Sequence, residues 1–331
     1  MPDGMARART LLATLADGRF HSGQELGQAL GVSRAAMWKL VERLRKYGVQ
    51  IDAVAGRGYR LAQPVELLEP TAIAAAFESS YGRPLPVEVL FRCDSTNHVL
   101  LERARAGADA QLLTTEIQHA GRGRWGRRWA APFGSSLCLS LLWRFPPLPH
   151  GLAGLSLAIA IGVAEALTAL EAPVRLKWPN DILLGEKKLG GILIEIVGEV
   201  EGPCLAVIGI GLNLTGGETI AAQAEQPVAT LEQALGVRAC ARNSLAGQVG
   251  AAMASVCERF AAEGFAAFAP RWRQYDAFAD MPVVLMLPGE DVRGIARGVD
   301  ARGGLLLERD GRVETRHSGD LRLRLRRDTA A

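Results

Sequence analysis

A glycine-rich string, GRGRWG at residues 121–126, most constrains the fold of this chain, because it matches the dinucleotide-binding pattern G-x-G-x-x-G. That pattern requires a strand before it, a helix opening directly from it, and an acidic residue about 20 positions later. A strand is predicted at 112–117, but the string runs into a helix-hostile stretch at 131–134, and residues 128–164 contain no Asp or Glu. The sequence therefore argues against a Rossmann fold, and the absence of a G-x-x-x-x-G-K-[ST] pattern argues against a P-loop.

Arginines crowd the same string, at Arg122, Arg124, Arg127 and Arg128. Glycines let a backbone approach a ligand closely, and the forked guanidinium group pairs with phosphate or carboxylate oxygens two at a time. The combination predicts a loop that surrounds an anion. A solvated basic hairpin is the alternative interpretation, and the motifs on either side favour the anion site.

Charge is unevenly distributed along the 331 residues. Residues 1–63 contain ten Lys and Arg against five Asp and Glu, whereas the remainder contains 28 against 30. The length predicts two or three domains, and 49% hydrophobic residues can fill their cores. The asymmetry predicts a small nucleic-acid-facing module attached to a larger, nearly neutral body.

The cysteines are odd in number, far apart and set mostly among apolar neighbours: Cys93, Cys138, Cys204, Cys240 and Cys257. With no C-x-x-C pattern and no charged-then-apolar leader, they predict reduced core thiols in a cytoplasmic protein and no zinc site. The uncharged stretch between Arg144 and Glu165 approaches the roughly 20 residues of a membrane span. Its prolines and His150 predict instead a buried helix at 152–170, so no membrane partner is expected.

The first segment has the pattern of three short helices and a hairpin. The predicted elements are helices at 8–16, 22–30 and 34–47 and strands at 49–54 and 59–61. Ser22 and Ser33 are the expected N-caps, and Gly31 lies in the turn between the second and third helices. This is the pattern of a winged helix-turn-helix. The apolar residues expected to pack its helices together are Leu26, Leu30, Val32, Ala36, Leu40 and Leu44.

In a winged helix the third helix enters the major groove and the wing touches phosphates. The predicted DNA-binding residues are Ser22, Ser33, Arg34, Ala35, Met37, Trp38, Lys39, Arg57 and Arg60. A helical cap with a packing or regulatory role is the alternative interpretation. Steeply salt-dependent binding of duplex DNA distinguishes the two.

Beyond this segment the pattern is α+β. The predicted domains are a winged helix-turn-helix at 1–63, a linker at 64–70, a mixed α+β domain at 71–278 and a small C-terminal domain at 279–331. The middle domain is expected to have a mainly antiparallel, mixed sheet backed by helices. A glycine-rich loop at 215–217 is expected to be mobile. Five short strands between 283 and 325, separated by turns that contain glycine, predict a small β-barrel.

Five strings resemble the bifunctional biotin–protein ligase and biotin operon repressor family: DSTN at 94–97, GRGRWGR at 121–127, KWPND at 177–181, KLGGILIE at 188–195 and GIGLN at 209–213. Their joint order and spacing carry the resemblance. It implies a winged helix, a central mixed sheet backed by helices as in class II synthetases and biotin ligases, and a C-terminal SH3-like barrel. It also implies that biotin is activated with ATP to biotinyl-5′-AMP and passed to a lysine of a carrier protein.

Such chemistry needs no protein nucleophile, so positioned cations and hydrogen-bond donors supply most of the catalysis. The resemblance implies Lys188, Arg124 and Asp181 as catalytic residues, with Lys188 bridging the biotin carboxyl group and the phosphate, and it leaves Lys187 as a solvated turn residue. The implied biotin-binding residues are Ser95, Thr96, Asn97, Gln118, Arg122, Gly123, Arg124 and Lys188. Capping of the following helix by Ser95 or Thr96 is an alternative role for these two.

The implied adenylate-binding residues are Arg124, Arg127, Trp129, Asn180, Lys188, Asn213 and Arg324. Asp181 is the candidate ligand of Mg²⁺, because hard cations favour carboxylate oxygens. The same carboxylate can equally orient Lys188 or a neighbouring arginine.

Regulation is also implied by the resemblance. Adenylate binding orders the glycine-rich loops, favours a homodimer and aligns two winged helices on a two-fold operator. The expected partners are operator DNA and a biotin carboxyl carrier protein, as in acetyl-CoA carboxylase. Two alternatives stay open: a lipoate-type acyl-protein ligase, which shares the catalytic fold, and a non-catalytic biotin-sensing DNA-binding regulator.

Overall fold

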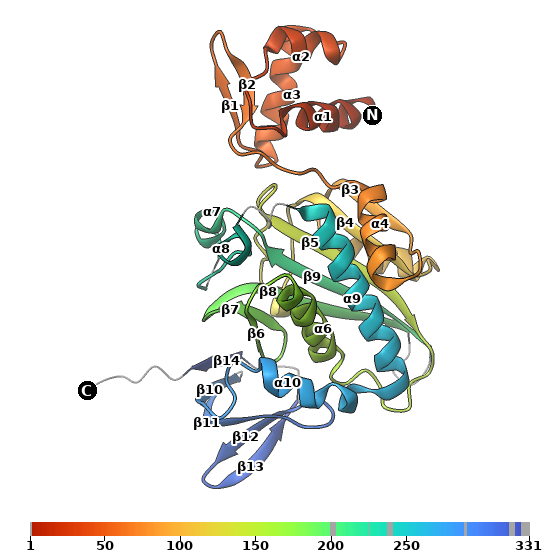
Figure 1. Ribbon diagram of the computed structural model, residues 1–331, viewed down its shortest axis with the longest axis vertical. Helices are drawn as coiled ribbons and strands as arrows, with labels where there is room; N and C mark the ends of the chain where they lie inside the picture. The colour runs from red at the N-terminus through yellow and green to blue at the C-terminus, as the bar shows by residue number, and fades with distance from the viewer. Residues whose placement is uncertain are drawn as a thin grey trace, which may run out of the picture.

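The computed structural model divides into three parts along its long axis, with the N-terminal module and the C-terminal sheet at opposite ends of a central α+β body (Figure 1). It describes residues 2–198, 203–224, 226–236, 241–287, 290–317 and 322–325, with side chains from residue 5 onward except those of 290 and 322–325. Cys240 lies outside the described residues.

The N-terminal module is a winged helix-turn-helix, as predicted. Its elements are α1 (Pro2–Leu15), α2 (Gly23–Ala29), α3 (Arg34–Lys46), β1 (Ile51–Val54) and β2 (Gly58–Leu61). The side chains of Ser22 and Ser33 cap α2 and α3, accepting hydrogen bonds from the backbone N–H groups of Gln24 and Ala36. β1 and β2 pair antiparallel to form the wing. The two capping predictions are therefore confirmed.

Two predictions about α3 are wrong. Its buried stripe consists of Met37, Leu40, Val41 and Leu44, the i, i+3, i+4, i+7 spacing of one helix face. Met37 is therefore a core residue with 1% exposure, not a DNA contact. Ala36 lies beside this stripe and is exposed, so it does not pack the helices together.

The central body is built on a seven-stranded sheet of order β3-β4-β5-β9-β8-β7-β6. Only the β3–β4 pair is parallel, so the predicted mixed, mainly antiparallel sheet is confirmed. The strands are β3 (Val87–Cys93), β4 (Gln111–Gln118), β5 (Ser136–Phe145), β6 (Val174–Lys177), β7 (Asp181–Leu184), β8 (Lys187–Gly198) and β9 (Cys204–Asn213).

Helices cover both faces of this sheet. One face carries α4 (Pro70–Tyr81), α6 (Leu155–Ala169) and α9 (Arg242–Glu263), and the other carries α5 (Thr96–Arg105). The alternation along β5 shows how: Leu139 and Leu141 join the first core, whereas Leu142 packs under α5. Shorter helices complete the fold: η1 (Arg124–Gly126), α7 (Gly217–Ala221), α8 (Glu232–Leu235), η3 (Phe265–Ala267) and α10 (Ala269–Tyr275).

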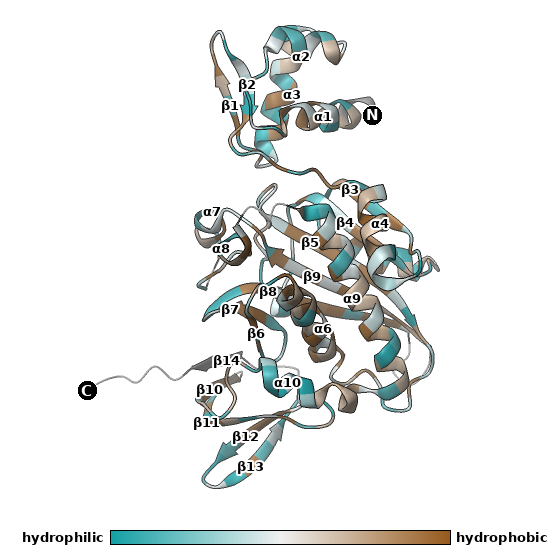
Figure 2. Ribbon diagram, viewed as in Figure 1, coloured by the Kyte–Doolittle hydropathy of each residue, from teal (hydrophilic) through white to brown (hydrophobic). Residues whose placement is uncertain are grey.

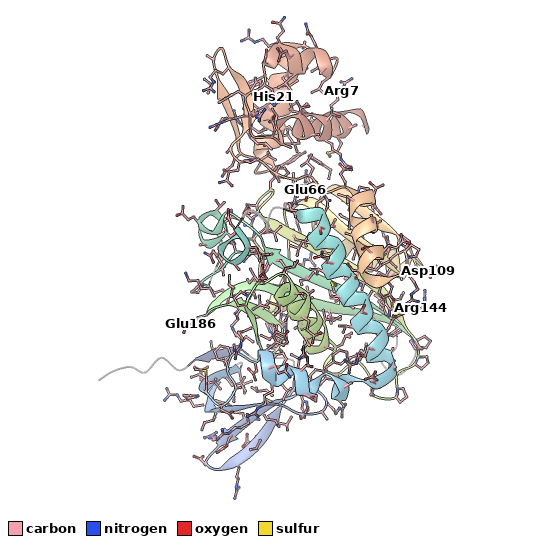
Figure 3. The ribbon with its side chains drawn as sticks, in the orientation of Figure 1. Arg7, His21, Glu66, Asp109, Arg144 and Glu186 are labelled. Atoms are coloured by element: carbon pink, nitrogen blue, oxygen red, sulfur yellow. The ribbon has the colours of Figure 1, made fainter. Side chains whose placement is uncertain are left out.

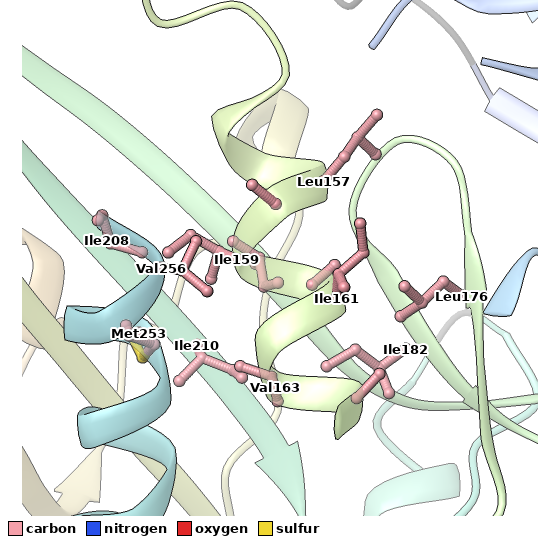
Figure 4. Close-up of a cluster of buried hydrophobic side chains, with 14 of the residues drawn as sticks. Leu157, Ile159, Ile161, Val163, Leu176, Ile182, Ile208, Ile210, Met253 and Val256 are labelled. Carbon is pink, nitrogen blue, oxygen red and sulfur yellow. The ribbon is translucent and has the colours of Figure 1, made fainter. Parts of the chain in front are cut away.

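The uncharged stretch after Arg144 forms α6, which is apolar on nearly all sides (Figure 2). Figure 4 shows four of its side chains, Leu157, Ile159, Ile161 and Val163, packed among residues of the sheet and of α9. A helix that is apolar all round is stable only when it is enclosed, and the predicted buried helix is confirmed. Among the residues that the structure describes, no helix combines the length and the apolar character needed to cross a bilayer.

The C-terminal part is a five-stranded antiparallel sheet of order β13-β12-β11-β10-β14. The strands are β10 (Pro282–Leu287), β11 (Glu290–Val299), β12 (Leu305–Arg309), β13 (Arg312–Arg316) and β14 (Arg322–Leu325). Its apolar side chains, among them Leu285 and Leu307, share one core with the central body. The indole N–H of buried Trp178 donates to the carbonyl of Gly303 at 3.0 Å, which ties the KWPND string to this sheet.

Candidate active site

A cavity of about 210 Å³ lies on the α5 side of the central sheet. It collects residues from all five strings that carry the family resemblance. The predicted site residues that line it are Ser95, Thr96, Asn97, Gln118, Arg122, Gly123, Arg124, Arg127, Trp129, Asn180, Asp181, Lys188 and Asn213. Arg128, the remaining arginine of the predicted anion loop, also lines it, as do Lys177, Trp125 and Cys138, for which no ligand contact was predicted.

The floor of the cavity is nearly bare backbone. Residues 209 and 211 of β9 and residue 191 of β8 point toward the cavity side of the sheet, and all three are glycines. A Cβ at Gly209 would overlap the side chain of Asn97, and one at Gly211 would overlap the indole of Trp129. Glycine is therefore required here so that two cavity residues can lie flat against the strand.

The arginine string folds as a small hairpin rather than a dinucleotide loop. Its two arms pair through Trp129 N to Gly121 O at 2.8 Å and Gly123 N to Arg127 O at 2.7 Å. A single turn, η1, closes it, and β5 follows without an intervening helix in this described stretch. The exclusion of the Rossmann pattern is thus correct, and the hairpin arches over the cavity between β4 and β5.

A buried polar wall closes one end of the cavity. We use "polar wall" for Ser95, Thr96, Asn97 and Gln118, which line the cavity, together with Ser140, which bonds to two of them; all but the half-buried Gln118 are buried. The Oε1 atom of Gln118 accepts from the backbone N–H of Thr96 at 3.0 Å, so Gln118 caps α5. Ser95 occupies the N-cap position without a side-chain capping bond, and the alternative role for Ser95 and Thr96 as capping side chains is wrong. The capping group of α5 therefore comes from the end of β4, across the interface between sheet and helix.

Ser140 is a residue that the sequence analysis missed. It is fully buried on β5, and its Oγ lies 2.7 Å from both Thr96 Oγ1 and Asn97 Oδ1. The amide nitrogen of Asn97 donates to Glu195 Oε2 at 2.8 Å and to Leu193 O at 3.2 Å. The wall is therefore held in place by its own hydrogen bonds. A lone serine within an apolar strand was the only sequence signal for Ser140.

The opposite side of the cavity is charged. Lys188 Nζ lies 2.6 Å from Asp181 Oδ1 and 5.8 Å from the centre of the Trp129 ring. Lys177 Nζ lies 3.5 Å from the other Asp181 oxygen. Burial opposes ionisation of Asp181, but Lys188 and Lys177 outweigh it and hold the pKa of this carboxyl below its usual value. Lys187 is exposed, as expected, although it is the first residue of β8 rather than part of the turn before it.

The side chains of Asn213 and Asn180 donate hydrogen bonds to backbone carbonyl groups near the cavity. Asn213 Nδ2 donates to the carbonyls of Ala229 at 3.1 Å and Lys188 at 3.3 Å, and so pins the segment after α7 against β8. Asn180 Nδ2 donates to Ile192 O at 2.8 Å. Both residues use their amide nitrogen for these bonds.

Three polar atoms in this site are buried and have no hydrogen-bond partner among the described residues: Arg127 Nε, Trp129 Nε1 and Asn213 Oδ1. A buried group in that state costs free energy unless a ligand or water satisfies it. Two donors and one acceptor at the same side of the cavity suit a polar ligand such as a nucleotide.

The donor set does not fit a metal held by the protein. Asp181 is neutralised by two ammonium groups, and the described residues contain no group of three or more His, Cys, Asp or Glu that could hold an ion. The orienting role of Asp181 is the one that this geometry supports. Arg324 pairs with Val284 in the C-terminal sheet, and its side chain lies outside the described ones.

The predicted DNA-binding residues share one module, and most are exposed. Arg34, Ala35, Trp38 and Lys39 form the exposed side of α3, where Trp38 is 55% exposed. On the wing, the guanidinium carbons of Arg57 and Arg60 lie 4.1 and 4.7 Å from the centre of the Phe20 ring. Arg60 also forms an ion pair with Asp52, with 2.9 Å between its Nε and the carboxylate oxygen. Arg57 is the more available of the two for phosphate. Ser22 and Ser33 act as helix caps.

Comparison with known families matches the three parts of the chain. Residues 89–213 match the biotin/lipoate A/B protein ligase family, residues 7–60 match an HTH domain, and residues 282–324 match the biotin protein ligase C terminal domain. These matches confirm the predicted fold class and the order of the parts.

Curated and solved relatives agree with these matches. The bifunctional ligase/repressor BirA of Salmonella typhimurium is 41% identical over 316 residues, which is 95% of this chain and 97% of the relative. That of Escherichia coli is 40% identical over 315 residues, 95% of this chain and 96% of the relative. The biotin protein ligase of Aquifex aeolicus, solved in complex with biotin and ATP, is similar with a TM-score of 0.60 and 25% identity, and the match covers 73% of this chain and 99% of that one.

Proposed function

This chain belongs to the family of bifunctional biotin–protein ligases and repressors, and from that premise we propose how its residues divide the two activities. It is an ATP-dependent biotin–protein ligase with a repressor function. The observation that carries the ligase assignment is a cavity that has a polar wall, bonded within itself, at one end and the Lys188–Asp181 pair at the other.

The polar wall suits biotin better than lipoate. The fused ring of biotin presents ureido N–H donors and a carbonyl acceptor, which need fixed hydrogen-bond partners. The dithiolane ring of lipoate has no such groups, so it would form no hydrogen bonds with the polar side chains of the wall. A site whose groups hydrogen-bond a polar substrate strongly rejects an analogue that lacks the polar group. The ring of biotin is therefore assigned to the wall, and its carboxyl group to the charged side.

Adenylation then needs positioning and charge rather than a protein nucleophile. A biotin carboxylate oxygen attacks the α-phosphorus of ATP, the bond to the β-phosphate oxygen breaks, and pyrophosphate leaves. Lys188, oriented by Asp181, bridges the carboxylate and the α-phosphate, and Arg124 binds the phosphate from the hairpin. In the second step the amine of a carrier lysine attacks the acyl carbon, and AMP leaves. The unpartnered atoms of Trp129, Arg127 and Asn213 contact the nucleotide.

Magnesium belongs with the substrate in this proposal. ATP carries Mg²⁺ on its phosphate oxygens, and Mg²⁺ commonly keeps its own waters and few protein ligands. Asp181 contributes by orienting Lys188.

The repressor activity uses the exposed side of α3 and the wing. Arg34, Trp38 and Lys39 enter the major groove, and Arg57 contacts phosphate. A homodimer formed with adenylate bound would place two winged helices on a two-fold operator. The carrier protein and the operator are thus the two macromolecular partners, and both are encountered in the cytoplasm.

One experiment tests the ligase assignment. The protein is incubated with ATP, Mg²⁺ and biotin, and biotinyl-adenylate is measured together with pyrophosphate release. We expect adenylate with biotin and little or none with lipoate at the same concentration. A folded protein that forms no biotinyl-adenylate would overturn the enzyme assignment, and equal use of lipoate would overturn the substrate assignment. Labelling of a biotin carboxyl carrier protein then tests the transfer step.

A further inference from the structure

The segment that joins the winged helix to the central body is held by a buried ion pair outside the active site. Arg242 Nη1, at the start of α9, lies 2.8 Å from Glu116 Oε2 on β4. Their side chains are only 2% and 5% exposed. Neither residue has a place in the proposed ligase chemistry. A buried ion pair stabilises a fold poorly compared with apolar packing, so its use here calls for a reason other than stability.

The pair and its neighbour bind four consecutive residues of the joining segment, Glu66 to Glu69. Arg242 donates to Glu66 O at 2.8 Å, and Glu116 Oε1 accepts from the backbone N–H of Leu68. Asn243 donates to Leu67 O at 2.9 Å and accepts from Glu69 N at 2.7 Å. We call Glu116, Arg242 and Asn243 the linker clamp. The backbone of the segment is therefore bonded at nearly every available group, unlike a flexible tether.

The same segment is bonded to the winged helix. Val65 N donates to Ala16 O at 2.9 Å, and Arg9 on α1 reaches Leu68 O at 3.1 Å. Ile117, the neighbour of Glu116 on β4, is buried in the core of the winged helix. Figure 3 shows Glu66 at the junction of the two parts. The linker clamp thus fixes the winged helix as well as the segment itself.

The clamp also adjoins the ligand cavity. Glu116 stands two residues before Gln118 of the polar wall on the same strand. Burial raises the pKa of the Cys138 thiol, which lines the cavity, to about 12, and the charge of Arg242 acts on that thiol in the opposite sense. A second cavity, of about 590 Å³, lies between the winged helix and the central body. Both cavities are lined by Gln118, Arg128 and Trp129.

We propose that Glu116 and Arg242 are positioning residues for DNA recognition, which hold the winged helix at the orientation that operator binding requires. Glu116 lies on β4, the strand that also carries Gln118. The inference rests on the proposed repressor function and deepens it. The orientation matters because two winged helices must present their third helices at the spacing of successive major grooves. A winged helix on a loose tether would lose effective concentration at its second half-site.

The test uses Glu116→Gln, which keeps the shape and removes the charge, in the full-length protein. The matched control is Glu88→Gln, which breaks the Glu88–Arg103 ion pair on β3 of the same sheet, away from the linker. Three quantities are measured: hydrogen exchange of a peptide spanning 65–70, biotinyl-adenylate formation, and affinity for a duplex selected from a random library by the wild-type protein with biotin and ATP.

We expect amide exchange at 66–69 to rise about 100-fold and affinity for the selected duplex to fall about 10-fold or more. Adenylate formation should stay within about 3-fold of the wild type, since the wall keeps its own hydrogen bonds. The control should change neither exchange nor DNA affinity. Faster linker exchange with unchanged DNA affinity, or unchanged exchange, would overturn the proposal.

A second variant guards against misfolding. Glu66→Ala removes an exposed carboxylate that accepts from Asn243 N at 2.9 Å, and it leaves the buried pair intact. We expect the same two effects at a smaller size, with an unchanged unfolding temperature. If the wild type selects no duplex at all, the repressor function fails. Distances between spin labels on α3 and α9 then test the positioning role alone: they should be broader in Glu116→Gln than in the wild type, and unchanged distances would overturn it.

Discussion

The two sides of the ligand cavity are built differently. The polar wall is mostly buried, and Ser140, Thr96, Asn97 and Gln118 already bond one another. The charged side consists of the arginine hairpin with Lys188 and Asp181, and two of its donors, Arg127 Nε and Trp129 Nε1, have no partner among the described residues. One side is complete without a ligand, whereas the other gains hydrogen bonds when a ligand arrives.

This difference matches the two tasks of the site. Selection of biotin needs a wall that does not rearrange, because rejection of an analogue depends on groups that cannot relax. Stabilisation of a phosphate that forms during the reaction needs donors that are not already used. We therefore expect changes in the wall to alter biotin binding and changes on the charged side to alter the rate and the retention of the adenylate.

The largest expected effect is on the charged side. Lys188→Ala should lower the rate of biotinyl-adenylate formation by about 10²–10³-fold, as when a transition-state donor is removed, with a smaller change in biotin affinity. Pyrophosphate exchange and a direct biotin titration measure the two quantities. Lys187→Ala, an exposed neighbour, serves as the control and should be near wild type. An equal effect of both variants would argue against a specific role for Lys188.

The wall should be broken by Gly209→Ala. Its Cβ would overlap Asn97, so we expect biotin to bind about 100-fold more weakly and the free energy of unfolding to fall by about 1–3 kcal/mol. Gly217→Ala is the matched change outside the cavity lining, where the new Cβ would lie 3.4 Å from the nearest atom. That variant should bind biotin within a few fold of the wild type. Calorimetric titration measures biotin affinity, and thermal unfolding measures stability. A loss of affinity in the control but not in Gly209→Ala would contradict the prediction.

Removal of a single hydroxyl from the wall should have a moderate effect. Ser140→Ala leaves Asn97 Oδ1 and Thr96 Oγ1 without their shared partner, which costs about 1–3 kcal/mol in unfolding free energy. We expect biotin affinity to fall about 10-fold, because the ring partners lose their fixed positions. If affinity is unchanged while stability falls, the network is structural only.

Retention of the intermediate should depend on the hairpin. Arg124→Gly is expected to speed release of biotinyl-adenylate about 10-fold and leave biotin affinity nearly unchanged, because a charge-assisted phosphate contact is lost. Arg144→Gly, at an exposed position on β5 outside the cavity, is the control. Release is followed by chasing labelled adenylate with unlabelled ligand. Unchanged release would reject the phosphate contact.

The smallest effect concerns stability in acid. The pKa of Asp181 is lowered in the fold, so its pairing stabilises the protein above the ordinary carboxyl value of 3.8 and is lost as the pH falls through the lower folded value. Asp181→Asn should remove this component, so the stability difference from wild type should shrink below pH 3.8. Chemical unfolding at several pH values measures it. A difference that stays constant into acid would contradict the pairing.

Elements with local signals were predicted well from the sequence. The helix caps at Ser22 and Ser33 and the enclosed helix α6 depend on residues within a few positions of one another, and the structure confirms them. Residues that act across the sheet were not predictable in this way. Ser140 and the capping role of Gln118 depend on the alignment of β4, β5 and α5, which no short pattern encodes.

The sequence by itself determined the order of the three parts, the motifs that belong to the site and the rejection of a dinucleotide fold, because these follow from local spacing and composition. Only the tertiary structure decided which of those residues meet: Lys188 with Asp181, Gln118 with Thr96, and Arg242 with Glu116. The physical reason is that a hydrogen bond acts over about 3 Å, a distance that the packing of strands and helices sets between residues far apart in the chain.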